Sequence, residues 1–140
     1  MAIRVLIAKS NPLRRMGLAR LLDAEDDLRV VFEAADGREA LLAVERLRPE
    51  VIVISDILTN PEAVKVMKAV QPSAQIIVLV GDEESVLLAA AAGADASILR
   101  GAGAPAIIDA IRAAAARRAG FDLSIAEKEI DTDSAPGPRI

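Results

Sequence analysis

Two uninterrupted apolar runs decide the fold of this chain: Val51-Ile52-Val53-Ile54 and Ile76-Ile77-Val78-Leu79-Val80. Both are short and rich in β-branched residues, and neither alternates with polar residues. Strands of this kind are covered on both faces, as in the middle of a parallel sheet. The two runs therefore predict central strands of a sheet that has helices on both sides.

Three further strands are predicted around these two, over residues 3–8, 28–32 and 96–99. Helical periodicity separates the strands, and cap or turn signals bound each helix. These signals are Asn11-Pro12, Asp36-Gly37, Pro61, Asp82 and Pro105. The first helix carries an apolar stripe of Leu13, Met16, Leu18, Leu21 and Leu22. Five βα units in succession predict a (βα)5 α/β fold with a doubly wound, parallel, five-stranded sheet.

The C-terminal end has a different composition. Gly120 interrupts the last helix, which we expect to end near Ala119, and residues 131–138 have no periodicity. We therefore expect one domain over residues 1–120 and a flexible tail over 121–140. About twenty residues cannot hold a helix-turn-helix, so we expect no binding of nucleic acid by this chain alone.

The composition excludes several kinds of chemistry. The 140 residues include no Cys, His, Trp or Tyr, which excludes disulfides, thiolate or imidazole metal sites and a Ser-His-Asp triad. Lys and Arg number 17 against 21 Asp and Glu, a net charge of −4 that favours neither nucleic acid nor an acidic membrane as partner. No apolar run approaches the roughly 20 residues of a membrane helix. We expect a cytoplasmic protein that is not an enzyme.

Several motifs, taken in order, resemble the bacterial response-regulator receiver domain, in the branch usually followed by a helix-turn-helix. The opening run 3–8 with Asn11-Pro12-Leu13-Arg14 is similar to that branch, and so is the segment 33–41. Arg48-Pro49-Glu50 and Ala92-Gly93-Ala94 also fit. The resemblance covers about residues 2–120. It implies a flavodoxin-like fold with strand order 2-1-3-4-5.

The resemblance also implies a chemistry, phosphoryl transfer to an aspartate at the end of the third strand. In the family two acidic residues after the first strand help that aspartate to hold Mg²⁺. A Ser or Thr after the fourth strand and a Lys after the fifth contact the phosphoryl oxygens. The attack of a carboxylate on an anionic donor needs this cationic shielding.

This chain departs from the family at nearly every one of those positions. Lys9-Ser10 replaces the acidic pair, and Ser55 falls at the phospho-acceptor position. Val80 replaces the hydroxyl residue and Arg100 the lysine. Asp56, one residue after Ser55, is the candidate phospho-acceptor if the loop slips. We expect weak or absent Mg²⁺ binding, no cofactor, and an ion pair of Lys9 or Arg100 with Asp56.

If phosphorylation is lost, a binding surface remains. In the family the face of the fourth helix, fifth strand and fifth helix commonly carries dimerisation or partner docking. Here that stretch is rich in Ala, and small side chains allow close approach of helices. The candidate interface residues are Leu87, Leu88, Ala91, Ile107, Ile111 and Arg112.

Three functions therefore stay open. The first is a pseudo-receiver that signals through protein contacts, with a protein partner or as a homodimer, and without phosphorylation. The second is a receiver phosphorylated at Asp56 in an altered pocket. The third is an α/β domain that binds a small anion or metabolite through Lys9 and Arg100.

Overall fold

The computed structural model describes residues 2–55 and 61–130, and it describes side chains up to residue 119. In these residues five strands and five helices alternate along the chain. The strands are β1 (Ile3–Ala8), β2 (Leu28–Ala34), β3 (Val51–Ser55), β4 (Gln75–Val80) and β5 (Ala96–Leu99). The helices are α1 (Pro12–Asp23), α2 (Gly37–Leu47), α3 (Pro61–Val70), α4 (Glu83–Ala92) and α5 (Ala104–Ile130). A 3₁₀ turn, Arg100–Ala102, precedes α5. The described elements therefore follow the predicted (βα)5 order.

The strands form one parallel sheet in the order β2-β1-β3-β4-β5, which confirms the predicted fold. Every residue of β3 is buried, as its uninterrupted apolar sequence predicts. β5 lies at an edge of the sheet, and none of its four residues is fully buried.

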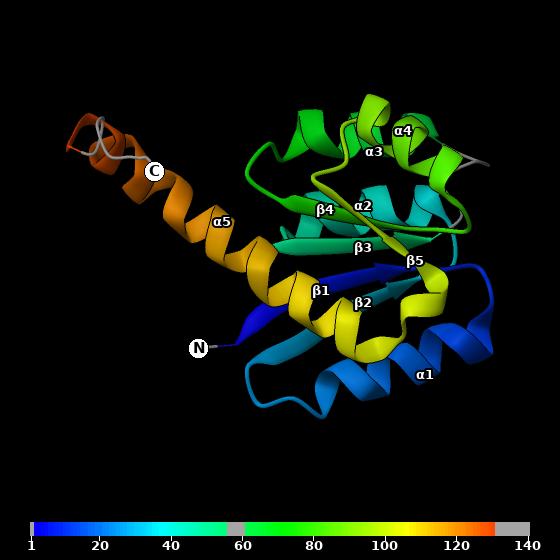
Figure 1. Ribbon diagram of the computed structural model, residues 1–140. Helices are drawn as coiled ribbons and strands as arrows, with labels where there is room; N and C mark the ends of the chain where they lie inside the picture. Colours follow the sequence, from blue (N-terminus) through cyan, green and yellow to red (C-terminus); the bar gives the residue numbers. More distant parts are fainter. Residues whose placement is uncertain (1, 56–60, 131–140) are drawn as a thin grey trace.

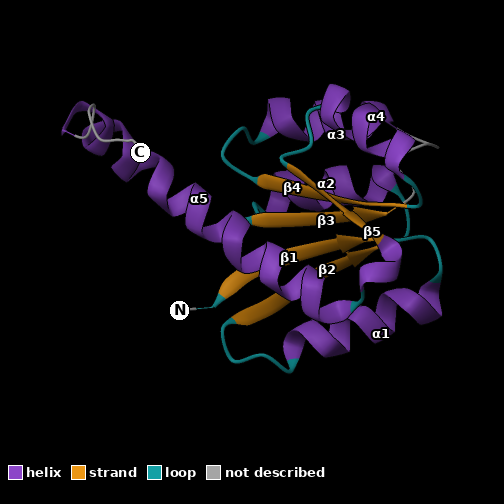
Figure 2. Ribbon diagram, viewed as in Figure 1, coloured by secondary structure: helices purple, strands orange, loops and turns teal. Residues whose placement is uncertain are grey.

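Helices cover both faces of the sheet (Figures 1 and 2). One core lies between the sheet and α2, α3 and α4, around Leu6, Ile52 and Met67. The other lies between the sheet and α1 and α5, around Ile77 and Ile111. The strand residues of the two cores alternate along β1, β3 and β4, because successive side chains point to opposite faces.

Side-chain caps begin three of the helices. Asn11, Asp36 and Asp82 each accept a hydrogen bond from the backbone N–H three residues later. Asp82 accepts from both the backbone N–H and the hydroxyl of Ser85, at 2.9 Å each. These two bonds, with a smaller contribution from the charge of Arg100, hold the pKa of the Asp82 carboxyl below its ordinary value of 3.8.

Two sequence expectations about helix surfaces and ends are wrong. Leu13, Met16 and Leu21 of α1 are 80%, 49% and 53% exposed. The inward stripe is instead Arg15, Leu18, Ala19 and Leu22, with the spacing i, i+3, i+4, i+7.

α5 does not end near Ala119 but continues through Gly120 to Ile130. A glycine inside a helix costs only about 1 kcal/mol, which its helix-forming neighbours offset. The helix runs past the edge of the sheet (Figure 1). Residues 131–140, the rest of the expected tail, lie outside the described residues. Among the described residues, no helix has the length and apolar character needed to cross a membrane.

The packing of α5 on the sheet predicts a large effect of Ile111→Ala. Ile111 is fully buried. We expect the change to lower the free energy of unfolding by about 2–5 kcal/mol, through lost burial and a cavity. Urea denaturation measures it. Leu42→Ala, at a 59% exposed position on α2, is the control and should change the value by less than about 0.5 kcal/mol. Equal unfolding midpoints for Ile111→Ala and wild type would contradict this packing.

The cap of α4 predicts a pH dependence. Because the pKa of Asp82 is lowered in the folded state, its stabilisation is present above the unfolded-state pKa and is lost as the pH falls through the folded-state pKa. The difference in Tm between wild type and Asp82→Ala should therefore be largest above about pH 5 and narrow on acidification. Asn11→Ala, which removes the cap of α1 without changing a titratable group, is the control and should show no such narrowing. A difference that widens at low pH would exclude this role.

Candidate functional site

The carboxyl ends of the central strands meet at one edge of the sheet. Ala8 of β1 lies beside Ile54, Ser55 of β3 beside Leu79, and Val80 of β4 beside Leu99. The ends of β1, β3, β4 and β5 therefore lie along one edge, although they are far apart in sequence. We call this the carboxyl edge, where a parallel sheet places its ligands.

Lys9 and Ser55 come together at the carboxyl edge. The Nζ atom of Lys9 lies 3.4 Å from Oγ of Ser55, and Ser55 is buried. The backbone N–H of Lys9 donates to the carbonyl of Ala34 at 3.0 Å, which continues the β1–β2 pairing by one residue. The ammonium group is thus held at the end of β3.

Arg15 holds the backbone of Lys9 in place, and this contact was not predicted. Its NH1 donates to the carbonyl of Lys9 at 2.9 Å, and its Nε lies 3.5 Å from Oε1 of Glu33. The side chain of Arg15 is 16% exposed. The only available signal was its position one helical turn after the loop that carries Lys9.

Arg100 lies across the end of β4. A Cβ atom placed on Gly81 would come within 3.2 Å of NH2 of Arg100, so the guanidinium lies against the Gly81 backbone. Its charge also acts on Asp82, where it contributes to the lowered pKa. The glycine therefore leaves the room that the arginine occupies.

The remaining predicted site residues differ in exposure. Val80 is 1% exposed and belongs to the core, whereas Ser10 lies on the surface. Asp56, and with it the expected ion pair with Lys9 or Arg100, lies outside the described residues.

Mg²⁺ takes oxygen ligands, mainly carboxylates, and the described residues at the carboxyl edge do not group such ligands. The two positions after β1 hold Lys9 and Ser10. Among the described residues, no three acidic side chains lie close enough together to hold a metal ion.

The predicted interface residues divide into exposed and buried ones. Leu87 and Leu88 are 75% and 53% exposed, and Ala91 is also on the surface. Ile107 and Ile111 are buried against the sheet, so including them in a surface was wrong. They share the side of α5 that covers the sheet, whereas the candidate surface requires the opposite side.

Arg112 serves a contact within the chain. Its guanidinium binds Glu25 at 2.7 Å and Asp27 at 2.8 and 2.9 Å, which ties α5 to the turn before β2. These bonds raise the pKa of Arg112, and the bond from Arg112 lowers the pKa of Asp27.

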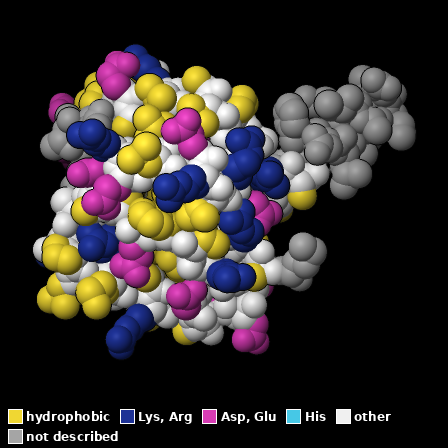
Figure 3. Space-filling model, turned by 180° about the vertical axis from the view of Figure 1, so that it is seen from behind, with side chains coloured by type: hydrophobic (Ala, Val, Ile, Leu, Met, Phe, Trp, Pro, Cys, Tyr) yellow, Lys and Arg dark blue, Asp and Glu magenta, His cyan; other side chains and the backbone are white. Residues whose placement is uncertain are grey.

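On the side of the molecule opposite to the view of Figure 1, apolar and charged side chains are mixed, and neither sign of charge dominates (Figure 3).

Known proteins similar to this chain point to one family. No protein-family profile matches the chain. It is 33% identical over 131 residues to the transcriptional regulatory protein LiaR of Bacillus subtilis, a match covering 90% of this chain and 62% of that protein. It is 38% identical over 91 residues to protein-glutamate methylesterase/protein-glutamine glutaminase 3 of Anaeromyxobacter dehalogenans, covering 62% of this chain and 26% of that protein. The chain thus spans less than two thirds of the length of either relative.

Solved structures give the same result over most of the described chain. The response regulator domain of Thermotoga maritima CheB superposes with a TM-score of 0.75 and 28% identity, covering 82% of this chain and 97% of that one. The chain therefore belongs to the response-regulator receiver domains of two-component signalling.

Proposed function

We propose that this receiver domain transmits its signal through protein contacts and independently of aspartate phosphorylation. The observation that carries the proposal is the position of Lys9, whose ammonium lies 3.4 Å from the Ser55 hydroxyl at the end of β3. In the family this edge of the sheet collects carboxylates and a divalent cation. Here the described residues at this edge include a lysine, a hydroxyl and an arginine, and the carboxylate of Asp82 is used as the cap of α4.

Electrostatics favour the loss of the metal. A dication about 4 Å from an ammonium group is repelled by roughly 8 kcal/mol at an effective dielectric constant of 20, if the lysine side chain keeps its position. Ser10 adds no compensating negative charge. Without the metal, an acyl phosphate has to form from two anions that repel each other.

The contacts for the phosphoryl group are weakened as well. Val80 is buried and has no hydroxyl to donate. Arg100 keeps a positive charge, but its planar guanidinium lies against Gly81 and differs in shape and reach from an ammonium group. These two replacements support the same conclusion as Lys9.

The surface that remains for protein contacts is centred on α4. Leu87 and Leu88 expose apolar side chains, and Ala91 next to them allows close approach of another helix. We propose this surface as the contact with a protein partner, which can be a second copy of the chain. In this proposal the chain acts in the cytoplasm and supplies neither catalysis nor nucleic-acid binding.

Acetyl phosphate tests the independence from phosphorylation. We expect no gain of a phosphoryl group in the intact mass of the protein after incubation with acetyl phosphate and Mg²⁺, because the part of the chain that the structure describes contains no cluster of carboxylates for the metal. Asp56→Asn is the control for modification at the candidate acceptor. A phosphoryl group gained by wild type and absent from Asp56→Asn would overturn the proposal in favour of a phosphorylated receiver.

The variant Lys9→Asp with Ser10→Asp restores the acidic pair. It tests whether these two residues cause the weak Mg²⁺ binding, separately from the replacements at Val80 and Arg100. We expect calorimetry to show about tenfold or more tighter Mg²⁺ binding in this variant than in wild type. Sub-millimolar binding by wild type that Asp56→Ala abolishes would contradict the electrostatic explanation.

Sedimentation tests the α4 surface as a contact between copies. If the chain dimerises through it, Leu88→Arg should shift the protein to monomer at all concentrations, because a charge is placed in an apolar contact. Leu13→Arg, at an 80% exposed position on α1, introduces the same side chain elsewhere and should leave the association unchanged. A wild-type monomer at high concentration would exclude the homodimer, and a dimer insensitive to Leu88→Arg would place the contact elsewhere.

A further inference from the structure

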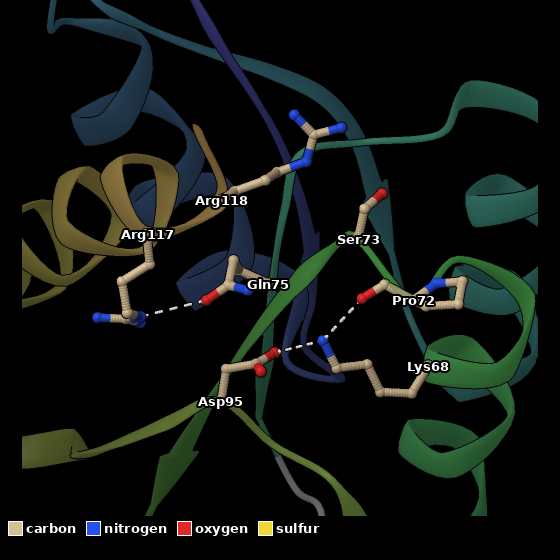
Figure 4. Close-up of a pocket in the computed structure, with 7 residues that line it drawn as sticks. All are labelled: Lys68, Pro72, Ser73, Gln75, Asp95, Arg117 and Arg118. Carbon is tan, nitrogen blue, oxygen red and sulfur yellow. Dashed lines mark hydrogen bonds and ion pairs between the residues drawn. The ribbon is translucent and has the colours of Figure 1, made fainter. Parts of the chain in front are cut away.

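A groove of about 840 Å³ lies at the opposite edge of the sheet, where the strands begin. Gln75 is the first residue of β4, and Asp95 immediately precedes β5. α5 passes over this edge and contributes two arginines (Figure 4). We call this the amino-edge groove. Its lining residues are Lys68, Pro72, Ser73, Gln75, Asp95, Arg117 and Arg118.

The amino-edge groove is positively charged, although the chain as a whole has a net charge of −4. Its lining contains three cations, Lys68, Arg117 and Arg118, and one carboxylate, Asp95. A groove that gathers one sign of charge attracts ligands of the other sign.

Lys68 and one oxygen of Asp95 are used by contacts within the protein. The ammonium group lies 2.8 Å from Oδ2 of Asp95 and donates to the carbonyls of Ala74 and Pro72 at 2.7 and 3.2 Å. The same oxygen of Asp95 accepts from the N–H of Ile76 at 2.8 Å. The Lys68 ammonium is therefore occupied by this pair, and the charged donors available to a ligand belong to the arginines.

Arg118 is poorly satisfied in comparison with Arg112 on the same helix. Arg112 has close carboxylate partners at 2.7–2.9 Å. Arg118 has one carboxylate at 3.6 Å, Oε2 of Glu50, and its buried Nε has no hydrogen-bond partner. A guanidinium left in this state gains more from an oxyanion than one that is already paired.

Arg117 and two polar neighbours complete the set of donors. Nε of Arg117 donates to Oε1 of Gln75 at 3.3 Å, which turns the guanidinium toward β4 and uses only one of its N–H groups. Figure 4 shows the side chains of Ser73, Gln75 and both arginines around the groove. Two forked guanidinium groups, a hydroxyl and an amide suit the oxygens of a phosphate or carboxylate group.

We propose that the amino-edge groove binds a small-molecule oxyanion, a metabolite carrying a phosphate or carboxylate group. Its volume lies in the range of small-molecule sites and exceeds what one inorganic ion fills. The ligand is held by Arg117 and Arg118, whose guanidinium groups turn onto its oxygens. This site is separate from the carboxyl edge, and it does not depend on whether the receiver is phosphorylated.

Calorimetric titration of the full chain with AMP, inorganic phosphate, citrate and adenosine tests the proposal. We expect AMP or citrate to bind with a Kd of about 1 mM or tighter at low salt, and adenosine, which has no anionic group, to give no binding. If AMP and phosphate bind and citrate does not, the ligand carries a phosphate group. If citrate binds and AMP and phosphate do not, the ligand carries a carboxylate group. No binding by any of the three anions at about 10 mM would overturn the proposal.

Paired variants locate the site. Arg117→Ala with Arg118→Ala should weaken binding by at least about tenfold, and Arg117→Lys with Arg118→Lys should also weaken it, because lysine keeps the charge and loses the fork. The matched control is Arg14→Ala with Arg38→Ala, two exposed arginines at the first turns of α1 and α2, which should change the Kd by less than about twofold. Unfolding curves verify that each variant is folded. If the double alanine variant does not fold, the Kd of the double lysine variant tests whether the ligand binds at Arg117 and Arg118.

A third pair, Lys9→Ala with Arg100→Ala, distinguishes the two edges of the sheet. The proposal requires unchanged binding in this variant. Loss of binding here, with normal binding in the Arg117 and Arg118 variants, would place the anion at the carboxyl edge and overturn the proposal.

Discussion

The parallel pairing of five strands is the constraint on which the rest of the structure depends. It brings every strand end to one of two edges and holds neighbouring ends in register, as between Ser55 and Leu79. The apolar side chains that enforce the pairing lie inside the strands, on both faces of the sheet. The residues just beyond the ends contribute little to that burial, so their chemistry can change while the fold persists.

The same separation explains what the sequence could predict. Strands β1 and β5 have the predicted bounds, because their signals are local apolar runs. The caps at Asn11 and Asp82 were equally predictable, since a cap acts within one helical turn. Lys9 follows β1 and Ser55 ends the adjacent β3, so the parallel order brings them near each other, but the contact predicted for Lys9 was with Asp56 and not with Ser55.

Features that depend on how distant elements pack were not predictable. α1 packs mainly on β2, with a smaller contact to α5, and Leu13 is exposed although it is one of the leucines of the predicted stripe. The pairing of Arg112 with Asp27 joins residues 85 positions apart, and no local pattern encodes it. The amino-edge groove is likewise formed from α3, β4 and α5 and exists only after folding.

The replacement of acidic residues at the carboxyl edge also has a consequence for stability. Carboxylates gathered to hold a divalent cation repel one another whenever the cation is absent, which is a cost that function imposes on the fold. In this chain Lys9 faces the Ser55 hydroxyl, and its loop is supported by Arg15. In our proposal the folded state therefore needs no metal to relieve charge repulsion at this edge. A receiver freed from phosphorylation can keep one conformation, and its α4 surface then presents Leu87 and Leu88 to a partner at all times.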